Sequence, residues 1–140
     1  MYSLHPTLAN DCFHLGNFPL SQLLLMNDCQ YPWFILVPQR ENIGEIYELS
    51  SEDQQQLNKE SCSLAKLLAS EYRADKMNIA ALGNVVPQLH IHHIVRYKTD
   101  PAWPAPIWGR LPTTPYPNQK ECVDKALKLL STSMEFVPLS

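Results

Sequence analysis

The chain has 140 residues, of which 45% are hydrophobic and 18% are charged, and its formal net charge at pH 7 is −3. This length predicts a single domain, residues 1–140, with a substantial hydrophobic core. The slightly negative charge excludes a general attraction to nucleic acid or to an anionic membrane, so we expect neither as a partner. The first ten residues lack the basic and apolar segments of a signal peptide, and no apolar run approaches a membrane span in length.

The four cysteines, Cys12, Cys29, Cys62 and Cys122, are widely scattered and form no C-x-x-C pair. This spacing argues against a zinc site and does not indicate a disulfide framework. We therefore expect reduced thiols and a cytoplasmic location.

Three strands are predicted in the first forty residues, over 12–18, 20–26 and 33–37, from alternating or continuous apolar runs bounded by turn residues and prolines. The second and third strands are joined by a short polar turn, which predicts a hairpin. Asn27 and Asp28 lie where the second strand ends, so their polar side chains can meet a ligand there. The alternative is that Asn27 and Asp28 only form the turn and contact no ligand.

A long helix is predicted from Ser50 to about Arg73, because a serine cap precedes acidic residues and an apolar stripe at helical spacing. A fourth strand is predicted over 76–82. Gly83 and Asn84 then form the turn into the next strand.

That fifth strand, predicted over 87–95, contains three of the five histidines within four positions. Because side chains alternate along a strand, Gln88, His90 and His92 are expected to share one face. Two imidazoles and an amide make that face polar and titratable, which indicates a reactive surface. His93 falls among apolar residues on the opposite face and is interpreted as a core residue. A partly unsatisfied buried imidazole is costly, so replacing His93 with leucine or valine is expected to keep activity and to raise stability.

Residues 99–117 contain six of the twelve prolines together with Trp103 and Trp108, which predicts a loop. The two tryptophans either cover a hydrophobic edge or form the wall of a pocket. Residues 118–121 resemble a capping box, and an amphipathic final helix is predicted to extend toward Met134. The predicted fold class is α+β, with an antiparallel sheet of about five strands, one long helix and a C-terminal helix.

The segment around the histidines resembles the signature of the histidine triad (HIT) family, in which three histidines alternate with apolar residues. In this alignment His90 is the middle histidine and His92 the third, while Gln88 stands in place of the first. His93 occupies a position that is apolar in the family. The segment resembles that of a bacterial-type HIT domain hydrolase with glutamine in place of the first signature histidine.

Other segments add to this resemblance, which covers roughly residues 12–110. Gly83-Asn84 resembles the family's approach to the signature strand, and Met26-Asn27-Asp28 followed by Phe34–Pro38 resembles its ribose-binding strand end and the strand after it. The resemblance implies a HIT-like fold with a core at about 12–110, a C-terminal loop and helix at 111–140, and a homodimer.

The resemblance also implies a mechanism without a cofactor. His90 would attack the α-phosphate of a purine nucleotide and form a nucleotidyl-histidine that water hydrolyses. A backbone carbonyl near position 88 would set its tautomer, and His92 would donate to the phosphate oxygens. The Gln88 amide would supply one neutral hydrogen bond but no charge, so some rate is lost, and Gln88→His is expected to raise the rate or leave it unchanged.

The implied nucleotide contacts come from the hairpin and the turn. Asn27, with Asp28, would bind the ribose hydroxyls, Leu25 would flank the base, and Asn84 would be a further nucleotide-binding residue. Two positions depart from the family pattern: Val85, where a hydroxyl side chain is common, and Phe34, where a further histidine often lies on the third strand. The substrate stays open between dinucleoside polyphosphates such as diadenosine tetraphosphate, nucleoside phosphoramidates and adenylylated groups.

Two alternatives belong to other classes of protein. A metal site would need His5 or His14 to converge with His90 and His92, because even a catalytic zinc takes three protein ligands. A nucleotide-binding or scaffolding protein with weak or no catalysis would explain the loss of the first histidine at Gln88.

Overall fold

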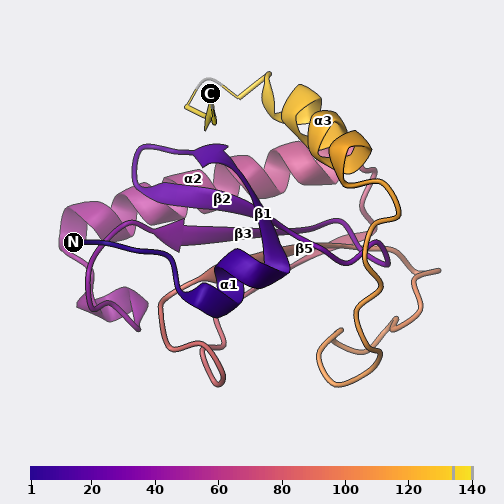
Figure 1. Ribbon diagram of the computed structural model, residues 1–140, viewed down its shortest axis with the longest axis horizontal. Coiled ribbons are helices and arrows are strands. Elements are labelled where there is room, and N and C mark those ends of the chain that lie inside the picture. The colour runs from indigo at the N-terminus through magenta and orange to yellow at the C-terminus, as the bar shows by residue number, and fades with distance from the viewer. Residues whose placement is uncertain (134, 140) are drawn as a thin grey trace.

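The computed structural model describes residues 1–133 and 135–139, and its centre is an antiparallel sheet (Figure 1). The described residues form a six-stranded sheet in the order β4-β5-β3-β2-β1-β6. The strands are β1 (Cys12–Asn17), β2 (Ser21–Met26), β3 (Trp33–Pro38), β4 (Lys76–Ala80), β5 (Ile91–Arg96) and β6 (Val137–Pro138). The predicted α+β class and antiparallel sheet are confirmed.

The helices are α1 (Pro6–Asp11), α2 (Ser51–Glu71) and α3 (Gln119–Leu130), and a short 3-10 helix, η1, spans Ile46–Glu48. The predicted caps are present: Ser50 accepts from the backbone N–H of Asp53, and Asn118 accepts from that of Glu121. Among these elements, none is a helix long and apolar enough to span a membrane. Met134, placed in the final helix by the sequence prediction, lies outside the described residues.

The two faces of the sheet carry different layers. Leucines of α2 and residues of α3 pack on one face in a core that includes Phe34 and Val95. The other face is covered by α1 and by the proline-rich segment, through contacts of Leu8 with a core that includes Trp33. Figure 1 shows α2 running along the far side of the sheet while α1 lies on the near side. Every residue of β3 is buried, because both faces of this strand are covered. Its sequence is therefore a continuous apolar run and does not alternate between apolar and polar residues.

The signature strand is shorter than predicted, because β5 begins at Ile91 rather than at 87. Pro87 has no N–H to donate to a ladder, and the N–H of Leu89 bonds to the carbonyl of Ile43 outside the sheet, at 2.9 Å. Gly83 adopts a left-handed φ of 77° where the chain turns. Residues 81–90 are therefore a loop, and the alternation expected to place Gln88 beside the histidines does not apply there.

Three small elements, α1, η1 and β6, were missed by the sequence prediction. Helix α1 has only six residues, too few to show helical periodicity, although Pro6 occupies its first turn. Strand β6 has two residues and pairs with β1 at Gly16 and Asn17. Gly16 permits this approach, since a Cβ there would lie 2.3 Å from the carbonyl oxygen of Val137.

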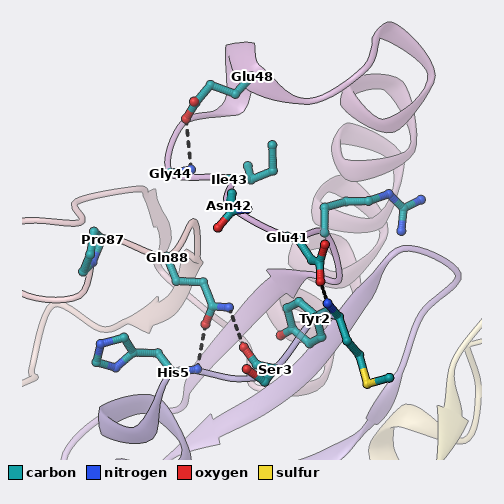
Figure 2. A pocket seen from close by; sticks show the side chains of 12 residues that line it. Tyr2, Ser3, His5, Glu41, Asn42, Ile43, Gly44, Glu48, Pro87 and Gln88 are labelled. Carbon is teal, nitrogen blue, oxygen red and sulfur yellow. Dashed lines mark hydrogen bonds and ion pairs between the residues drawn. The ribbon is translucent and has the colours of Figure 1, made fainter.

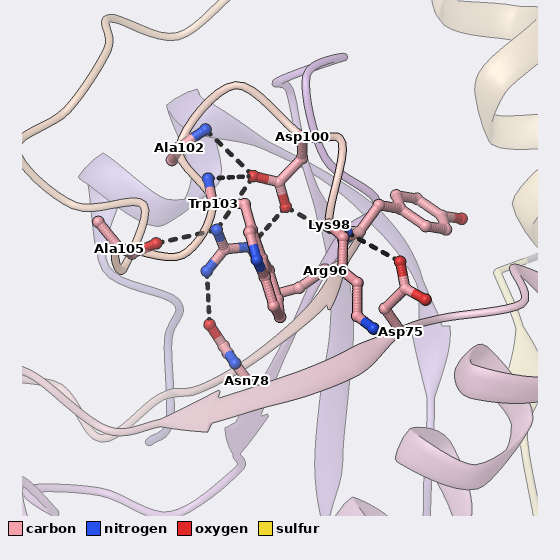
Figure 3. A network of polar contacts seen from close by, with 9 residues as sticks. Asp75, Asn78, Arg96, Lys98, Asp100, Ala102, Trp103 and Ala105 are labelled. Carbon is pink, nitrogen blue, oxygen red and sulfur yellow. Dashed lines mark hydrogen bonds and ion pairs between the residues drawn. The ribbon is translucent and has the colours of Figure 1, made fainter.

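A buried ion pair organises the proline-rich segment after β5 (Figure 3). Arg96, which is 1% exposed, donates from Nε and Nη2 to the Asp100 carboxylate at 2.8 and 3.0 Å. Its Nη1 donates to Asn78 at 2.7 Å, and its Nη2 also donates to the carbonyl of Ala105 at 2.9 Å. Burial alone would raise the pKa of Asp100, but the hydrogen bonds from Arg96 and nearby backbone N–H groups hold it below its usual value. The guanidinium carbon of Arg96 lies over the Trp103 ring, 5.6 Å from the ring centroid.

Candidate active site

A pocket of about 400 Å³ lies on the face of the sheet opposite α2, and His90 and His92 both line it. The remaining lining comes from α1, β2, β3, the loop after β4 and the proline-rich segment: Thr7, Leu8, Asp11, Met26, Trp33, Ile35, Leu82, Gly83, Asn84, Val85, Val86 and Trp108. Asp11 is the only charged residue other than histidine in this set. The pocket is therefore mostly apolar, with two imidazoles at one wall.

The backbone fixes the tautomer of His90. Its Nδ1 lies 2.7 Å from the carbonyl oxygen of Gln88, and a carbonyl can only accept, so Nδ1 carries the proton. The lone pair is then on Nε2, the nitrogen that a nucleophilic histidine uses. The backbone acceptor predicted near position 88 is present and does not depend on the side chain there.

A tryptophan fixes the tautomer of His92 in the opposite sense. The indole N–H of Trp33 lies 2.9 Å from Nδ1 of His92, and an indole nitrogen can only donate. Nδ1 is therefore the acceptor, and the proton of neutral His92 is on Nε2. Burial, followed by the neighbouring His90 and His93, lowers the pKa of His92 to about 3. At neutral pH His92 is thus an uncharged donor beside a ring with a free lone pair, with ring centroids 4.9 Å apart.

Trp33 was not named by the sequence interpretation, although it lines the pocket and donates to His92. The sequence interpretation named Phe34 as the third-strand position near the site, but Phe34 is fully buried in the core that contains α2. Alternation along β3 instead directs Trp33 and Ile35 into the pocket. The continuous apolar sequence of β3 gave no polar alternation from which to assign its faces.

Gln88 does not line the histidine pocket. Its side-chain oxygen accepts from the backbone N–H of His5 at 2.8 Å, and its side-chain nitrogen donates to the carbonyl of Ser3 at 2.9 Å (Figure 2). The expectation that the Gln88 amide shares a face with His90 and His92 is therefore wrong. Its side chain is held by the N-terminal segment, beside a separate groove of about 610 Å³.

The residues expected at the nucleotide lie in different places. Asn84 is exposed and lines the histidine pocket. Asn27 lines an adjoining cavity of about 270 Å³, which shares Asp11 and Met26 with that pocket, and its side-chain oxygen accepts from the N–H of Tyr116 at 2.9 Å. The two cavities are therefore neighbours that share two lining residues.

Asp28 and Leu25 do not face either cavity. Asp28 is 2% exposed, and its carboxylate accepts from Gln30 and from the backbone N–H of Thr114, so it ties the hairpin to the C-terminal segment. Leu25 packs in the core beneath α2, and Met26 takes the cavity-facing position that the sequence interpretation gave to Leu25.

His93 lies on the α2 face, as predicted, and is completely buried. Its Nδ1 donates to the carbonyl of Ile91 at 3.0 Å, and its Nε2 accepts from the hydroxyl of Ser61 at 2.7 Å. Burial lowers its pKa to about 4. Both ring nitrogens thus have partners, so His93 is a satisfied core residue and leucine there would cost two hydrogen bonds.

The remaining sequence expectations concern the tryptophans and a metal. Trp108 forms part of the pocket wall and packs against His92 with ring centroids 5.0 Å apart, whereas Trp103 covers Arg96. Within residues 1–133 and 135–139, no group of three or more His, Cys, Asp or Glu side chains is placed to hold a metal ion. The convergence of His5 or His14 with the signature histidines is not found there.

Comparison with known proteins identifies the family. The model of the HIT domain matches residues 7–99. The chain belongs to the HIT domain family. Membership implies nucleotide-binding hydrolase or transferase activity, and the pocket described above lies within the matched residues except for Trp108.

Solved structures of bacterial HIT proteins have the same fold. A histidine triad protein from Marinobacter aquaeolei VT8 is 51% identical, with a TM-score of 0.89 over 94% of this chain and 97% of that one. Proteins from Sinorhizobium meliloti 1021 and Bradyrhizobium japonicum are 41% and 40% identical, with TM-scores of 0.90 and 0.88. These alignments cover 94% and 93% of this chain and 96% of each of the others. No curated protein matches the chain.

Proposed function

We propose that this HIT protein hydrolyses a purine nucleotide substrate at its α-phosphate, with His90 as the nucleophile. The observation that carries the proposal is the opposed tautomers of the two signature histidines. The Gln88 carbonyl leaves His90 with a lone pair on Nε2, while Trp33 leaves His92 with a proton on Nε2. A nucleophile and a neutral donor are thus set side by side without any proton rearrangement.

In the proposed first step, Nε2 of His90 forms a bond to phosphorus, and the bond from phosphorus to the leaving group breaks with its electron pair. The His90 ring becomes positively charged, and its Nδ1–H remains bonded to the Gln88 carbonyl, which stabilises that charge. The Nε2–H of His92 donates to a phosphate oxygen as charge develops. An amine leaving group takes up a proton from solvent as it departs. Water then attacks phosphorus and gives up a proton to solvent, and the bond from phosphorus to Nε2 breaks with its electron pair returning to the ring, which releases His90 in its original tautomer.

The adjoining cavity supplies the proposed nucleoside contacts. Leu8, Met26 and Ile35 line an apolar region suited to a base. The ribose is proposed to lie toward Asn27, which lines the adjoining cavity next to the shared Asp11. Asn84 is proposed to contact the phosphate from the loop.

The charge of the pocket lining helps to choose between the two kinds of leaving group, a polyphosphate and an amine. Within the described lining there is no Lys or Arg, and the carboxylate of Asp11 is present. Diadenosine tetraphosphate brings several phosphate charges into the site, whereas a nucleoside phosphoramidate brings one, so the lining favours the phosphoramidate. Both substrate classes remain within the proposal.

The assembly and location are part of the same proposal. β4 is an end strand of the sheet, and apolar side chains are exposed on it and on the loop beyond, at Ile79, Leu82 and Val85. An unpaired strand edge with apolar neighbours favours pairing with a second copy, so we propose a homodimer of single-domain chains. The four cysteines are free, which fits a reducing compartment such as the cytoplasm.

The proposal is tested with a hydrolysis panel of adenosine phosphoramidate, diadenosine tetraphosphate and an adenylylated amine, with AMP affinity measured by calorimetry. His90→Ala is expected to lower turnover by at least about a thousandfold while AMP still binds. His92→Ala should cost roughly a hundredfold, as for one lost oxyanion donor. Gln55→Ala, at an exposed position on α2, is the matched control. Near-normal hydrolysis by His90→Ala would refute the mechanism, and AMP binding without any turnover would favour the non-catalytic alternative.

A further inference from the structure

The amide of Gln88 pairs with the backbone of the N-terminal segment on both sides. Its oxygen accepts from the N–H of His5 and its nitrogen donates to the carbonyl of Ser3, at 2.8 and 2.9 Å (Figure 2). A primary amide presents a donor and an acceptor in one plane, as a peptide group does. Gln88 therefore binds residues 3–5 much as a neighbouring strand would, although the two segments are more than eighty positions apart in the chain.

The segment that Gln88 holds leads directly into the pocket wall. His5 is the N-cap of α1, and its Nδ1 accepts from the backbone N–H of Thr7 at 3.1 Å. Helix α1 then contributes Thr7, Leu8 and Asp11 to the lining. A helix of six residues has little stability of its own, so its position depends on tertiary contacts. The described contacts include the burial of Leu8 and the bonds to Gln88.

The main chain of Gln88 acts on the other side of the same pocket. Its carbonyl accepts from Nδ1 of His90 at 2.7 Å, and the next residue, Leu89, bonds to Ile43. One residue thus contacts the proposed nucleophile through its backbone and, through its side chain, the segment that leads into the α1 part of the pocket lining.

We propose that Gln88 is a positioning residue whose side chain seats the N-terminal segment and α1 as a wall of the nucleotide pocket, a role that rests on the proposed function. The side-chain amide of Gln88 strengthens nucleotide binding through this wall, and it makes no contact with the phosphate during the reaction. This replaces the sequence expectation for Gln88→His. An imidazole has its donor and acceptor on diverging sides of the ring, so it cannot reproduce both bonds to Ser3 and His5. Gln88→His therefore weakens nucleotide binding and does not raise the rate.

The experiment compares Gln88→Leu and Gln88→Glu with the wild type and with Gln55→Ala. Leucine keeps the bulk without polar atoms, and glutamate keeps the acceptor for His5 but has no donor for Ser3. Amide hydrogen exchange of residues 3–11 is measured on the ligand-free proteins, and KM, kcat and AMP affinity are measured separately. For Gln88→Leu we expect exchange of these amides and the AMP Kd to rise on the order of tenfold, as for the loss of one or two neutral hydrogen bonds. KM should rise in parallel, kcat should stay within about threefold, and glutamate should give an intermediate effect.

Each other result overturns the proposal. A fall in kcat with unchanged KM and unchanged exchange would make Gln88 a group that acts in the reaction. Faster exchange with unchanged KM and AMP affinity would make the anchor purely structural. The ¹⁵N shifts of His90 are recorded in each variant, and a change in its tautomer would assign the effect to the main chain of residue 88. If the wild type binds AMP but turns over no substrate, the catalytic proposal fails, while exchange and AMP affinity still decide the role of Gln88.

Discussion

Replacing Trp33 with phenylalanine removes the hydrogen bond that fixes the tautomer of His92 while keeping an aromatic ring in the pocket wall. In the native structure Nδ1 of His92 faces the indole N–H at 2.9 Å, so a second proton cannot be added there without breaking this bond. The bond therefore opposes protonation in addition to the effect of burial. Without it, both neutral tautomers become accessible and Nδ1 can be protonated.

The magnitude follows from the cost of a buried, unpaired acceptor, about 1–3 kcal/mol. Since one pKa unit corresponds to about 1.4 kcal/mol, Trp33→Phe is expected to raise the pKa of His92 by about 1 to 2 from its native value of about 3. Burial by the remaining wall should keep it below the ordinary value. Turnover should fall about tenfold, less than for His92→Ala, because a fraction of the rings still presents Nε2–H.

Long-range ¹H–¹⁵N spectra of the imidazoles report the tautomer and the pKa directly. We expect a pure Nε2–H pattern for His92 in the wild type and a mixture in Trp33→Phe. Trp108→Phe is the matched control, because among the described residues Trp108 packs on His92 edge-on without a hydrogen bond to it. An unchanged tautomer and pKa in Trp33→Phe would refute the assignment of this role to Trp33.

Three further predictions concern stability, and urea unfolding measures each. Acid should destabilise the protein: His93 titrates at about 4 and His92 at about 3 when folded, but both titrate near 6.5 when unfolded, so the unfolded chain binds more protons below pH 6.5 and each histidine contributes a loss of about 2 kcal/mol between pH 7 and pH 5. His93→Gln should remove about half of this dependence, the share of His93, and an equally steep profile would contradict it. Ser61→Ala should cost about 1 kcal/mol by removing the donor to His93, and a cost near zero would mean that the bond contributes nothing. Arg96→Met should cost about 3–5 kcal/mol because it leaves the Asp100 carboxylate buried without its partner, whereas a cost below 1 kcal/mol would show that the site relaxes.

Much of the fold could be predicted because its signals are local. The serine cap and acidic first turn located α2, and Asn118 located the start of α3. Prolines and turn residues bounded the first three strands. Helix α1, the 3-10 helix η1 and strand β6 were not predicted, because six, three and two residues are too few to show a period. The signature strand was predicted too long because an apolar loop and an apolar strand have the same pattern.

The candidate site was predictable where it depends on the signature histidines and not where it depends on distant contacts. His90 and His92 were located, and the backbone acceptor for His90 was anticipated. The partner of His92 was not, since Trp33 lies in a fully buried strand whose two faces the sequence does not distinguish. The partners of Gln88 are backbone atoms of Ser3 and His5, and backbone atoms have no sequence signature.

The central claim, that His90 is the nucleophile, is tested most directly by trapping the intermediate. The wild type is mixed with excess adenosine phosphoramidate, quenched in base within a few turnovers and analysed by mass spectrometry after proteolysis. The mechanism predicts one adenylyl group on the peptide that contains His90, sensitive to acid as a phosphorus–nitrogen bond should be, and absent from His90→Ala. Turnover with no adduct in a quench fast enough to sample the steady state, or an adduct on any other residue, would contradict it.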